Sequence, residues 1–293
     1  MTGHQSTATA DAHRSDEQPP LVTLLTDYGL GDEFVGVLHG VIAGICPQAR
    51  VIDITHGIER HDVRKGALVL RAALAYCPRG VHVAVVDPGV GTARRGVAVR
   101  AADGRILVGP DNGLLSLALE SAGGAVEAVE ITRSPLRLEP VSATFHGRDI
   151  FAPVAAHLAA GTPVAEAGEP FDPDTLVRLD LPAPKLDGAT IHAHVLTFDR
   201  FGNAILSASH EHATAVGLKL GRPVLVRTPR GERETLFVRT FGDVAPGELL
   251  LYEDSWRMLA LAVNRGDVRS VLGIAVDDKV TIAPVREAPG AQL

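Results

Sequence analysis

The sequence predicts a mixed α/β fold, in which an N-terminal α/β domain with a mainly parallel sheet precedes a C-terminal antiparallel domain that resembles a β-barrel. Short β-branched runs alternate with helical patterns from Leu21 onward, and this alternation is typical of a parallel sheet. Residues 190–286 instead alternate apolar with polar residues between turns and show little helical periodicity. The segment 181–189, rich in proline and glycine, separates the two patterns and is expected to be a linker.

The elements of the two domains follow from these patterns in chain order. In the N-terminal domain, residues 21–180, strands are expected at 21–28, 50–56 and 81–88, with helices between them at 32–47 and 61–78. A hairpin with its turn at Asp103-Gly104, a helix at 112–121, a strand at 126–131 and a helix at 148–160 complete this domain. In the C-terminal domain, residues 190–286, strands are expected at 190–198, 222–228, 234–241, 249–254 and 279–285. Residues 1–20 and 287–293 are expected to be tails, the first of them disordered because it is polar.

Composition and charge limit the classes of partner. The chain has 293 residues and a formal net charge of -7, whereas proteins that bind a nucleic-acid backbone need a dense basic face. Its apolar stretches are much shorter than the about 20 residues that span a bilayer. We therefore expect neither a nucleic-acid partner nor a membrane. The N-terminal segment lacks the apolar core of a secretory signal, and the spacing of Cys46 and Cys77 indicates no disulfide framework, so a cytoplasmic location is expected.

Acidic residues stand at the expected carboxyl ends of strands, where open α/β sheets bind ligands, and His146 stands at the start of a predicted helix. Asp27 follows the first strand, and its carboxylate either forms a turn or accepts hydrogen bonds from a ribose diol. Asp87 follows the third strand in a glycine-containing loop, and Arg94 can fold back on it as a structural ion pair or as part of a site. His146 stands beside Gly147, which leaves room for a ligand, and is either a general base or a hydrogen-bonded core residue.

Other patterns give no indication of a nucleotide-phosphate or metal site. The loop Gly89–Arg94 lacks the third glycine of a dinucleotide fingerprint, and no Lys-Ser or Lys-Thr follows it as in a P-loop. Two histidine pairs would each share one face of a strand, but no acid or cysteine near them completes a ligand set. These pairs are His192 with His194 and His210 with His212. We therefore expect no metal and no cofactor.

The segment Phe198–Asn203 places two aromatic residues, an acid and an amide within six residues at a turn. Such a segment is either a polar hairpin turn or a surface that offers a ring to a purine and polar groups to its edge. The sequence alone leaves both interpretations open.

Seven ordered motifs between residues 21 and 286 point to one family: TDYG, VIDITHGI, VVDPGVGT with Arg94, GPDNG, TFHGRD, FDRFGN and LAVN. The chain resembles the S-adenosylmethionine hydroxide adenosyltransferases, also called S-adenosylmethionine hydrolases, which are related to the fluorinating and chlorinating adenosyl halide synthases. The resemblance implies the two-domain fold predicted above, a homotrimer, and substrate sites between domains of neighbouring subunits. It also implies hydrolysis of S-adenosyl-L-methionine to adenosine and L-methionine, by in-line attack of water or hydroxide at the ribose C5′.

The same resemblance implies roles for residues at the matching positions. Asp87, Arg94 and His146 would hold the attacking water, with either the aspartate or the histidine as the base. Asp27 would bind the ribose. Residues of the C-terminal domain would contact the methionine and adenine parts of the substrate: Asp199, Phe201, Asn203, Phe241, Ser255, Val263 and Asn264.

Three other functions compete with hydrolysis. A halide synthase is disfavoured because Asp87 stands where these relatives have a tyrosine, and a carboxylate about 4 Å from an anion repels it by several kcal/mol. A non-catalytic protein would bind S-adenosylmethionine or adenosine in the same pocket without forming product. A metal-dependent hydrolase would use Asp87 and His146 together with the pair His192 and His194.

Overall fold

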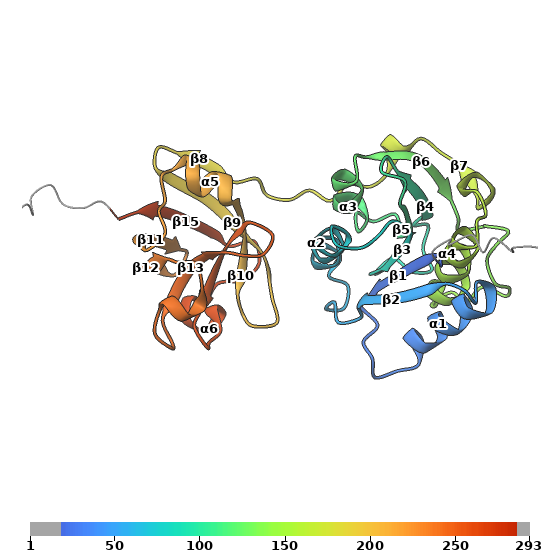
Figure 1. Ribbon diagram of the computed structural model, residues 1–293, viewed down its shortest axis with the longest axis horizontal. Helices are drawn as coiled ribbons and strands as arrows, with labels where there is room; N and C mark the ends of the chain where they lie inside the picture. The colour runs from blue at the N-terminus through green and yellow to red at the C-terminus, as the bar shows by residue number, and fades with distance from the viewer. Residues whose placement is uncertain (1–18, 286–293) are drawn as a thin grey trace, which may run out of the picture. The chain divides into compact units, whose positions relative to one another are not determined.

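The computed structural model describes residues 19–285, and the chain divides into two compact units between Val177 and Arg178 (Figure 1). The tails expected at residues 1–20 and 287–293 lie almost entirely outside the described residues. Part of the segment 181–189, expected to be a linker, forms the short strand β8 (Lys185–Asp187), which pairs with the strand that follows it. Within residues 19–285, no helix is both long and apolar enough to cross a membrane.

Within the described residues, the first unit contains one sheet with the strand order β2-β1-β3-β5-β4-β6-β7. Its strands are β1 (Leu21–Thr26), β2 (Arg50–Thr55), β3 (Val81–Val85), β4 (Gly96–Ala101), β5 (Ile106–Pro110), β6 (Ala125–Glu130) and β7 (Glu169–Pro170). Strand β1 is parallel to β2 and β3, and β3 is parallel to β5, whereas β4 runs antiparallel to both β5 and β6. Most strands therefore point the same way, which confirms the predicted mainly parallel sheet.

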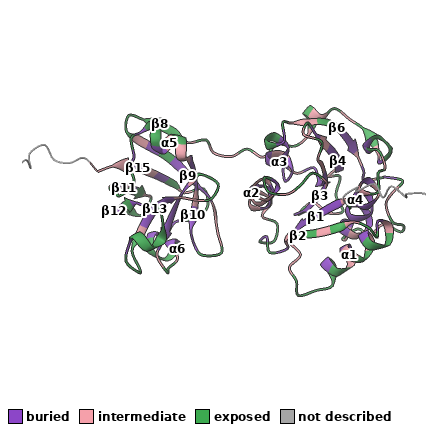
Figure 2. Cartoon of the chain, in the orientation of Figure 1, coloured by how far each residue is buried: buried purple, intermediate pink, exposed green. Residues whose placement is uncertain are grey.

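Four helices of the described chain cover the two faces of this sheet (Figure 1). They are α1 (Phe34–Ile45), α2 (Val63–Leu74), α3 (Ser116–Ser121) and α4 (Ala152–Ala159). Val22 and Leu24, which alternate along β1, share one buried cluster with Leu38 of α1 and Val154 of α4. The central strands are buried between the helix layers (Figure 2). The helices cover the faces, so the carboxyl ends of β1 and β3 remain the place where loops can form a site.

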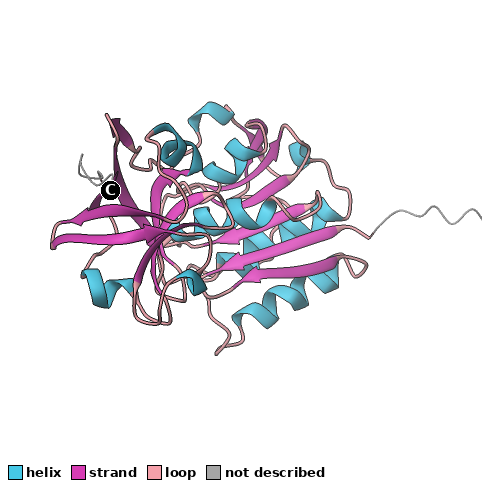
Figure 3. Ribbon diagram, turned by 60° about the vertical axis from the view of Figure 1, so that its left-hand side comes forward, coloured by secondary structure: helices cyan, strands magenta, loops and turns pink. Residues whose placement is uncertain are grey.

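The second unit is a closed barrel of seven strands within the described residues. Its strands are β9 (Thr190–Phe198), β10 (Ala204–Ser209), β11 (Arg222–Thr228), β12 (Gly231–Phe237), β13 (Leu249–Glu253), β14 (Met258–Val263) and β15 (Lys279–Pro284). The order is β10-β14-β13-β12-β11-β15-β9, and pairing of β9 with β10 closes the ring. All neighbours are antiparallel except β12 and β13. The predicted β-barrel-like domain is confirmed, and two short helices that the sequence did not predict, α5 (His210–Ala215) and α6 (Val268–Leu272), interrupt it (Figure 3).

Strand β14 shows why its sequence, MLALAV, does not alternate apolar with polar residues. Leu259 and Leu261 belong to the barrel interior. Ala260 and Ala262, which point the other way, pack in a second buried cluster with Val244 outside the barrel. A strand that is buried on both faces is apolar throughout, so period-two alternation fails to detect it.

Candidate functional site

Three side chains from two loops meet beyond the carboxyl end of β3. The Arg94 guanidinium donates two hydrogen bonds to the Asp87 carboxylate: Nε donates to Oδ1 at 3.0 Å, and Nη2 donates to Oδ2. Arg94 Nη2 also donates to Nδ1 of His146 at 3.1 Å. The two charged side chains are only 8% and 5% exposed. The structure therefore brings together the three residues that the sequence singled out as one group.

A glycine allows the loop that carries Asp87 and Arg94 to reach the loop that carries His146. Gly91 has a φ of 76°, and a Cβ placed on it would lie 2.5 Å from the carbonyl oxygen of Ala143. No side chain fits between these two backbones, and only glycine adopts this φ at little cost. The close approach of the two loops is therefore a condition for the contact between Arg94 and His146.

The start of α4 fixes the position of His146. The residues after it, Gly147–Phe151, form one π-helical turn before the α-helix begins. Pro153 has no N–H, so the carbonyl of Asp149 cannot accept the usual helical hydrogen bond and instead accepts one from the Leu138 N–H, at 2.8 Å. The buried Asp149 carboxylate also accepts from the Ser142 N–H at 2.7 Å. These bonds hold the segment before His146 against the first turn of the helix.

The contact with Arg94 decides the protonation state of His146. A guanidinium group only donates hydrogen bonds, so His146 Nδ1 is the acceptor, and the neutral ring carries its proton on Nε2. Burial lowers the pKa of His146, and the nearby Arg94 charge lowers this pKa further, against smaller opposing effects of two aspartates. The ring is therefore neutral near pH 7, and it offers the cavity a donor at Nε2.

Asp27, Asp87 and His146 line one cavity of about 150 Å³. The other residues around it are Tyr28, His61, Val85, Val90, Thr144 and Gly147. Asp27 Oδ2 accepts a hydrogen bond from the His61 N–H at 3.0 Å, which orients the carboxylate and leaves further lone pairs for a ligand. The sequence analysis missed Tyr28, His61 and Thr144 as cavity residues.

A buried hydrogen-bond network anchors the loop that carries Asp27 and Tyr28. The Thr26 hydroxyl accepts from the Tyr28 N–H at 3.1 Å and lies 2.8 Å from Nδ1 of His56. The Gly29 N–H donates to the His56 carbonyl at 2.8 Å. The other ring nitrogen of His56, Nε2, lies 3.1 Å from Asp53 Oδ1. The strand end that contains the motif VIDITHGI therefore supports the neighbouring loop.

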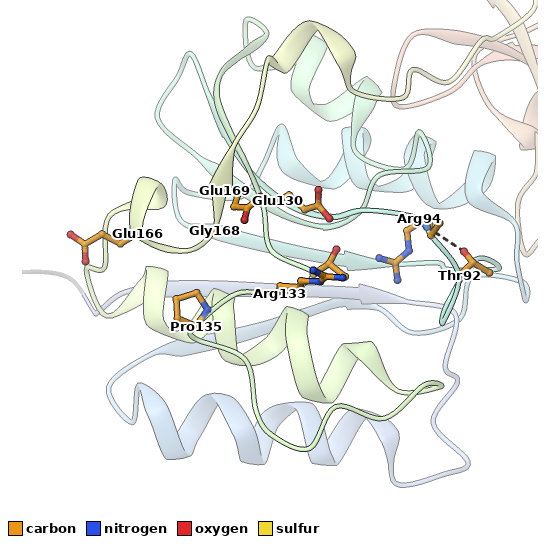
Figure 4. Close-up of a pocket in the computed structure, with 10 residues that line it drawn as sticks. Thr92, Arg94, Glu130, Arg133, Pro135, Glu166, Gly168 and Glu169 are labelled. Carbon is orange, nitrogen blue, oxygen red and sulfur yellow. Dashed lines mark hydrogen bonds between the residues drawn. The ribbon is translucent and has the colours of Figure 1, made fainter.

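A larger cavity, of about 670 Å³, lies on the other side of Arg94 (Figure 4). Arg94 and Arg133 line it together with three glutamates, Glu130, Glu166 and Glu169. Neither Asp87 nor His146 lines this cavity. Size alone would select it, but the smaller cavity is the candidate site because the converging polar groups face it.

In the second unit, the turn between β9 and β10 is organised around Asp199. Its Oδ1 accepts from the backbone N–H groups of Phe201 and Asn203 at 2.8 and 2.9 Å. Its Oδ2 accepts from the Asn203 side-chain amide at 2.7 Å. Asn203 is buried, whereas the Phe201 ring is 79% exposed. The polar turn is confirmed, whereas the binding of a purine by the exposed ring stays a prediction.

The remaining predicted residues of the second unit lie in neighbouring turns. Phe241 begins a short 3₁₀ turn, and its ring centre lies 5.0 Å from that of Tyr252. Ser255 is in the exposed turn between β13 and β14. Val263 ends β14 and is buried, and the Asn264 side chain donates to the Val244 carbonyl at 2.8 Å.

Two further residues of this unit were missed from the sequence, Tyr252 and Asp254. Burial raises the pKa of Tyr252, and the charges of Asp199 and Asp254 raise it further, so these three groups lie near one another. Tyr252 lies in β13, and Asp254 follows the last residue of that strand. In the sequence, the signal that could have pointed to these two residues was their position next to Ser255, a predicted site residue.

The histidine pairs do not form ligand sets. His192 and His194 lie on β9 as expected, but His210 and His212 lie in α5, where residues two apart do not face each other. Nδ1 of His210 lies 2.6 Å from a Glu253 carboxylate oxygen. Within residues 19–285, no three or more His, Cys, Asp or Glu residues are placed to hold a metal ion.

The chain is similar to known proteins in both of its structural units. Residues 22–168 match the model of the SAM hydroxide adenosyltransferase N-terminal domain, and residues 193–281 match that of the SAM hydroxide adenosyltransferase C-terminal domain. The chain belongs to this family. The motif resemblance is therefore confirmed, with one family domain matched in each structural unit.

Members of the family differ in the reaction they are named for. The chain is 52% identical to an (R)-S-adenosyl-L-methionine hydrolase of Salinispora tropica, over 90% of this chain and 97% of that protein. It is 29% identical to a fluorinase of Actinoplanes sp., over 84% of this chain and 91% of that protein. A crystal structure of an uncharacterized conserved protein from Thermotoga maritima superposes with a TM-score of 0.83 and 38% identity, covering 89% of this chain and 99% of that one.

Proposed function

We propose that the protein hydrolyses S-adenosyl-L-methionine to adenosine and L-methionine by in-line attack of water at the ribose C5′. The observation that carries this proposal is the convergence of Asp87, Arg94 and His146 beside a cavity that Asp27 also lines. Relatives that match nearly the full length of the chain and are named S-adenosylmethionine hydrolases support the same reaction.

Asp87 is the proton acceptor in this proposal. The Arg94 fork holds both carboxylate oxygens in place, and each oxygen retains a lone pair for the water. His146 cannot accept the proton, because its Nδ1 already accepts from Arg94 and its Nε2 bears the ring hydrogen. The histidine therefore donates a hydrogen bond to the water oxygen. The geometry thus supports Asp87 as the base, a choice that the sequence left open between the two residues.

The bond changes balance without a metal or cofactor. As the water oxygen forms its bond to C5′, one of its protons moves to the Asp87 carboxylate and later to solvent. The C5′–S bond breaks, and its electron pair converts the sulfonium into the neutral thioether of methionine. Charge is lost in this step, so a buried site favours it, and positioning alone can supply about 7–11 kcal/mol of the barrier.

The Asp27 carboxylate binds the ribose in this proposal. A carboxylate can accept from both hydroxyls of a ribose diol, and Asp27 keeps lone pairs free beside its bond to the His61 N–H. It shares the cavity with Asp87 and His146, so a ribose bound there brings C5′ near the attacking water.

The second unit completes the substrate site, which we place between neighbouring subunits of a homotrimer. The cavity of about 150 Å³ in the first unit is smaller than the about 300–1,000 Å³ typical of whole ligand sites. The exposed ring of Phe201, the Phe241 ring and the polar turn around Asp199 supply the remaining chemistry. Here the aromatic rings contact adenine, and the groups near Ser255 and Asn264 contact the methionine part and the adenine edge.

Water is preferred over halide because of the charge of Asp87. A halide at the position of the water would face a carboxylate that is 5% exposed, and two like charges about 4 Å apart repel by about 4 kcal/mol at an effective dielectric of about 20.

Cys46 and Cys77 are both free thiols in the structure. Unpaired cysteines are usual in reducing compartments, which supports a cytoplasmic location.

The test is incubation of the purified protein with S-adenosylmethionine in ¹⁸O-labelled water, followed by mass analysis of adenosine. We expect one ¹⁸O atom in the 5′-hydroxyl and equimolar methionine, with the (R)-sulfonium epimer consumed preferentially. Unchanged substrate together with a ligand-induced rise in Tm would instead identify a binding protein. Loss of activity with a chelator would require a metal, and 5′-chloro-5′-deoxyadenosine at high chloride would identify a halide synthase.

A further inference from the structure

The ring of Tyr28 is fixed at the wall of the catalytic cavity. Its centre lies 5.9 Å from the rings of both Phe34 and Phe145, in edge-to-face arrangements. Its backbone N–H is bonded to the Thr26 hydroxyl, so the residue is held at both ends. A tyrosine packed in this way has little freedom to turn its hydroxyl group away.

The Tyr28 hydroxyl lies directly against Gly147, the residue after His146. A Cβ placed on Gly147 would overlap the hydroxyl oxygen and would lie 3.2 Å from Cζ of the same ring. Gly147 does not have a positive φ, so its backbone conformation does not require glycine. The requirement for glycine here comes from the space that the tyrosine hydroxyl occupies.

The hydroxyl is available as a donor. Burial raises the pKa of Tyr28, and the charges of Asp27 and Asp87 raise it further while Arg94 opposes them. The group therefore stays protonated at neutral pH and cannot act as a base. Among residues 19–285, nothing hydrogen-bonds to this hydroxyl, although Tyr28 lines the cavity together with Asp87 and His146.

We propose that the Tyr28 hydroxyl is an additional catalytic group, which donates a hydrogen bond to the oxygen nucleophile, and that Gly147 makes room for it. The inference rests on the proposed hydrolysis. Attacking water has two lone pairs: one forms the bond to C5′, and the other accepts from the Nε2–H of His146. As a proton moves to Asp87, negative charge develops on the oxygen, which then accepts strong hydrogen bonds from both His146 and Tyr28.

The second donor is consequently used in the transition state and not in the bound ground state. Interactions of this kind raise kcat and leave substrate binding unchanged. This distinguishes Tyr28 from Asp27, whose bond to ribose would be present before and during the reaction. A donor to an anionic oxygen typically contributes about 10²–10³ in kcat.

The first test is Tyr28→Phe, which removes the hydroxyl and keeps the packed ring. We expect kcat for adenosine formation to fall about 10-fold or more, with KM and the Kd for adenosine unchanged. Tyr76→Phe, at a residue that is 77% exposed, is the matched control and should have wild-type kcat. Wild-type kcat in Tyr28→Phe, or a loss that appears only in KM, would overturn the role of Tyr28.

The second test is a double-mutant cycle between Tyr28 and Gly147. Gly147→Ala should lower kcat because its methyl group displaces the hydroxyl, whereas the same change in a Tyr28→Leu background should cost little more. Equal losses from Gly147→Ala in both backgrounds would overturn the steric part of the inference. An inactive wild-type protein would refute the proposed function as well, whereas normal wild-type turnover with neutral Tyr28 variants would refute only this inference.

Discussion

The two units prepare their polar groups in different ways. In the first unit, Asp87 and Arg94 are bonded to each other, and Arg94 is bonded to His146, which lies 52 residues further along the chain. In the second unit, the Asp199 side chain bonds to residues no more than four positions along the chain, and Phe201 stays exposed. The first unit therefore fixes its proposed reacting groups by long-range contacts, whereas the proposed binding surface of the second unit is built locally. Changes to Asp87, Arg94 or His146 should alter kcat, and changes in the second unit should alter KM.

The largest effect is expected from Asp87→Asn. The amide keeps the shape of the side chain but cannot take the proton from water, so kcat should fall about 100-fold or more. KM for S-adenosylmethionine should change little, because Asp87 contacts neither the ribose nor the adenine of the substrate in this mechanism. Steady-state kinetics of adenosine release measure both constants.

A buried Arg94 without its anionic partner destabilises the fold, so the Tm of Asp87→Asn needs a matched control. Asp111→Asn provides one, because the Asp111 carboxylate is also buried and pairs with an arginine, the partly exposed Arg95, outside the cavity. It should lower Tm comparably and retain kcat. Wild-type turnover in Asp87→Asn, or equal loss of kcat in both variants, would show that the first unit does not hold the base.

A smaller effect is expected from Thr26→Val, which tests the long-range support of the first unit. The change leaves the Tyr28 N–H and His56 Nδ1 without their buried partner, and unsatisfied buried groups cost about 1–3 kcal/mol. Thermal unfolding by circular dichroism should show a midpoint about 2–4 °C lower for each kcal/mol lost. Thr214→Val, on the exposed surface of α5, should leave the midpoint within about 1–2 °C of the wild type. Equal shifts of the unfolding midpoint in Thr26→Val and Thr214→Val would mean that the hydrogen bonds of Thr26 do not stabilise the first unit.

The second unit is tested by Phe201→Ala. Stacking of a base on an aromatic ring contributes about 1–3 kcal/mol, so KM should rise about 5- to 10-fold or more with kcat retained. The ring is exposed in the structure, so its removal leaves no cavity and Tm should not fall. A fall in kcat at saturating substrate would contradict the proposal that the second unit contributes to substrate binding and not to the chemical step.

The smallest effect is a shift of one titration. Because burial and Arg94 lower the pKa of His146, its ring should titrate below the ordinary histidine value of about 6.5 when followed by NMR. Arg94→Leu should raise this pKa, since it removes a positive neighbour and leaves the Asp87 charge. Because the pKa of His146 is lower in the folded state, protonation of this ring favours unfolding. The neutral ring's contribution to the free energy of unfolding is therefore fully present above the unfolded-state pKa and is lost as pH falls through the folded-state pKa. An unchanged titration in Arg94→Leu would contradict the assigned contact.

The class of both domains was predicted because it rests on local patterns. Asp87, Arg94 and His146 were grouped by their motifs and converge in the structure, and their catalytic role stays a prediction. Strands β1, β2 and β3 are rich in β-branched residues, and Asp27, His56 and Asp87 follow them at the ends where parallel sheets bind ligands. Helix α4 was predicted to begin at residue 148, whereas a π-helical turn precedes it, because Pro153 removes one helical donor.

Other features depend on tertiary contacts that no local pattern records. Strand β14 is apolar on both faces, and α5 and α6 are too short to show helical periodicity. Tyr28 was quoted within a motif, but its place in the cavity follows from the ring contacts with Phe34 and Phe145. For the turn residues of the second unit, the sequence predicted where they lie and not what they bind. The hydrogen bonds of Asp199 fit an ordinary turn as well as a binding surface.

The contact between Gly91 and the Ala143 carbonyl has a consequence for how this protein can vary. Surface loops normally tolerate insertions and changes of length. Here two loops rest on each other backbone to backbone, so the number of residues between Asp87 and Gly91, and between Ala143 and His146, sets the spacing of the reacting groups. One residue added to either loop would separate the acid from the imidazole while leaving every side chain present. Lineages that keep this chemistry are therefore constrained in loop length as tightly as in residue identity.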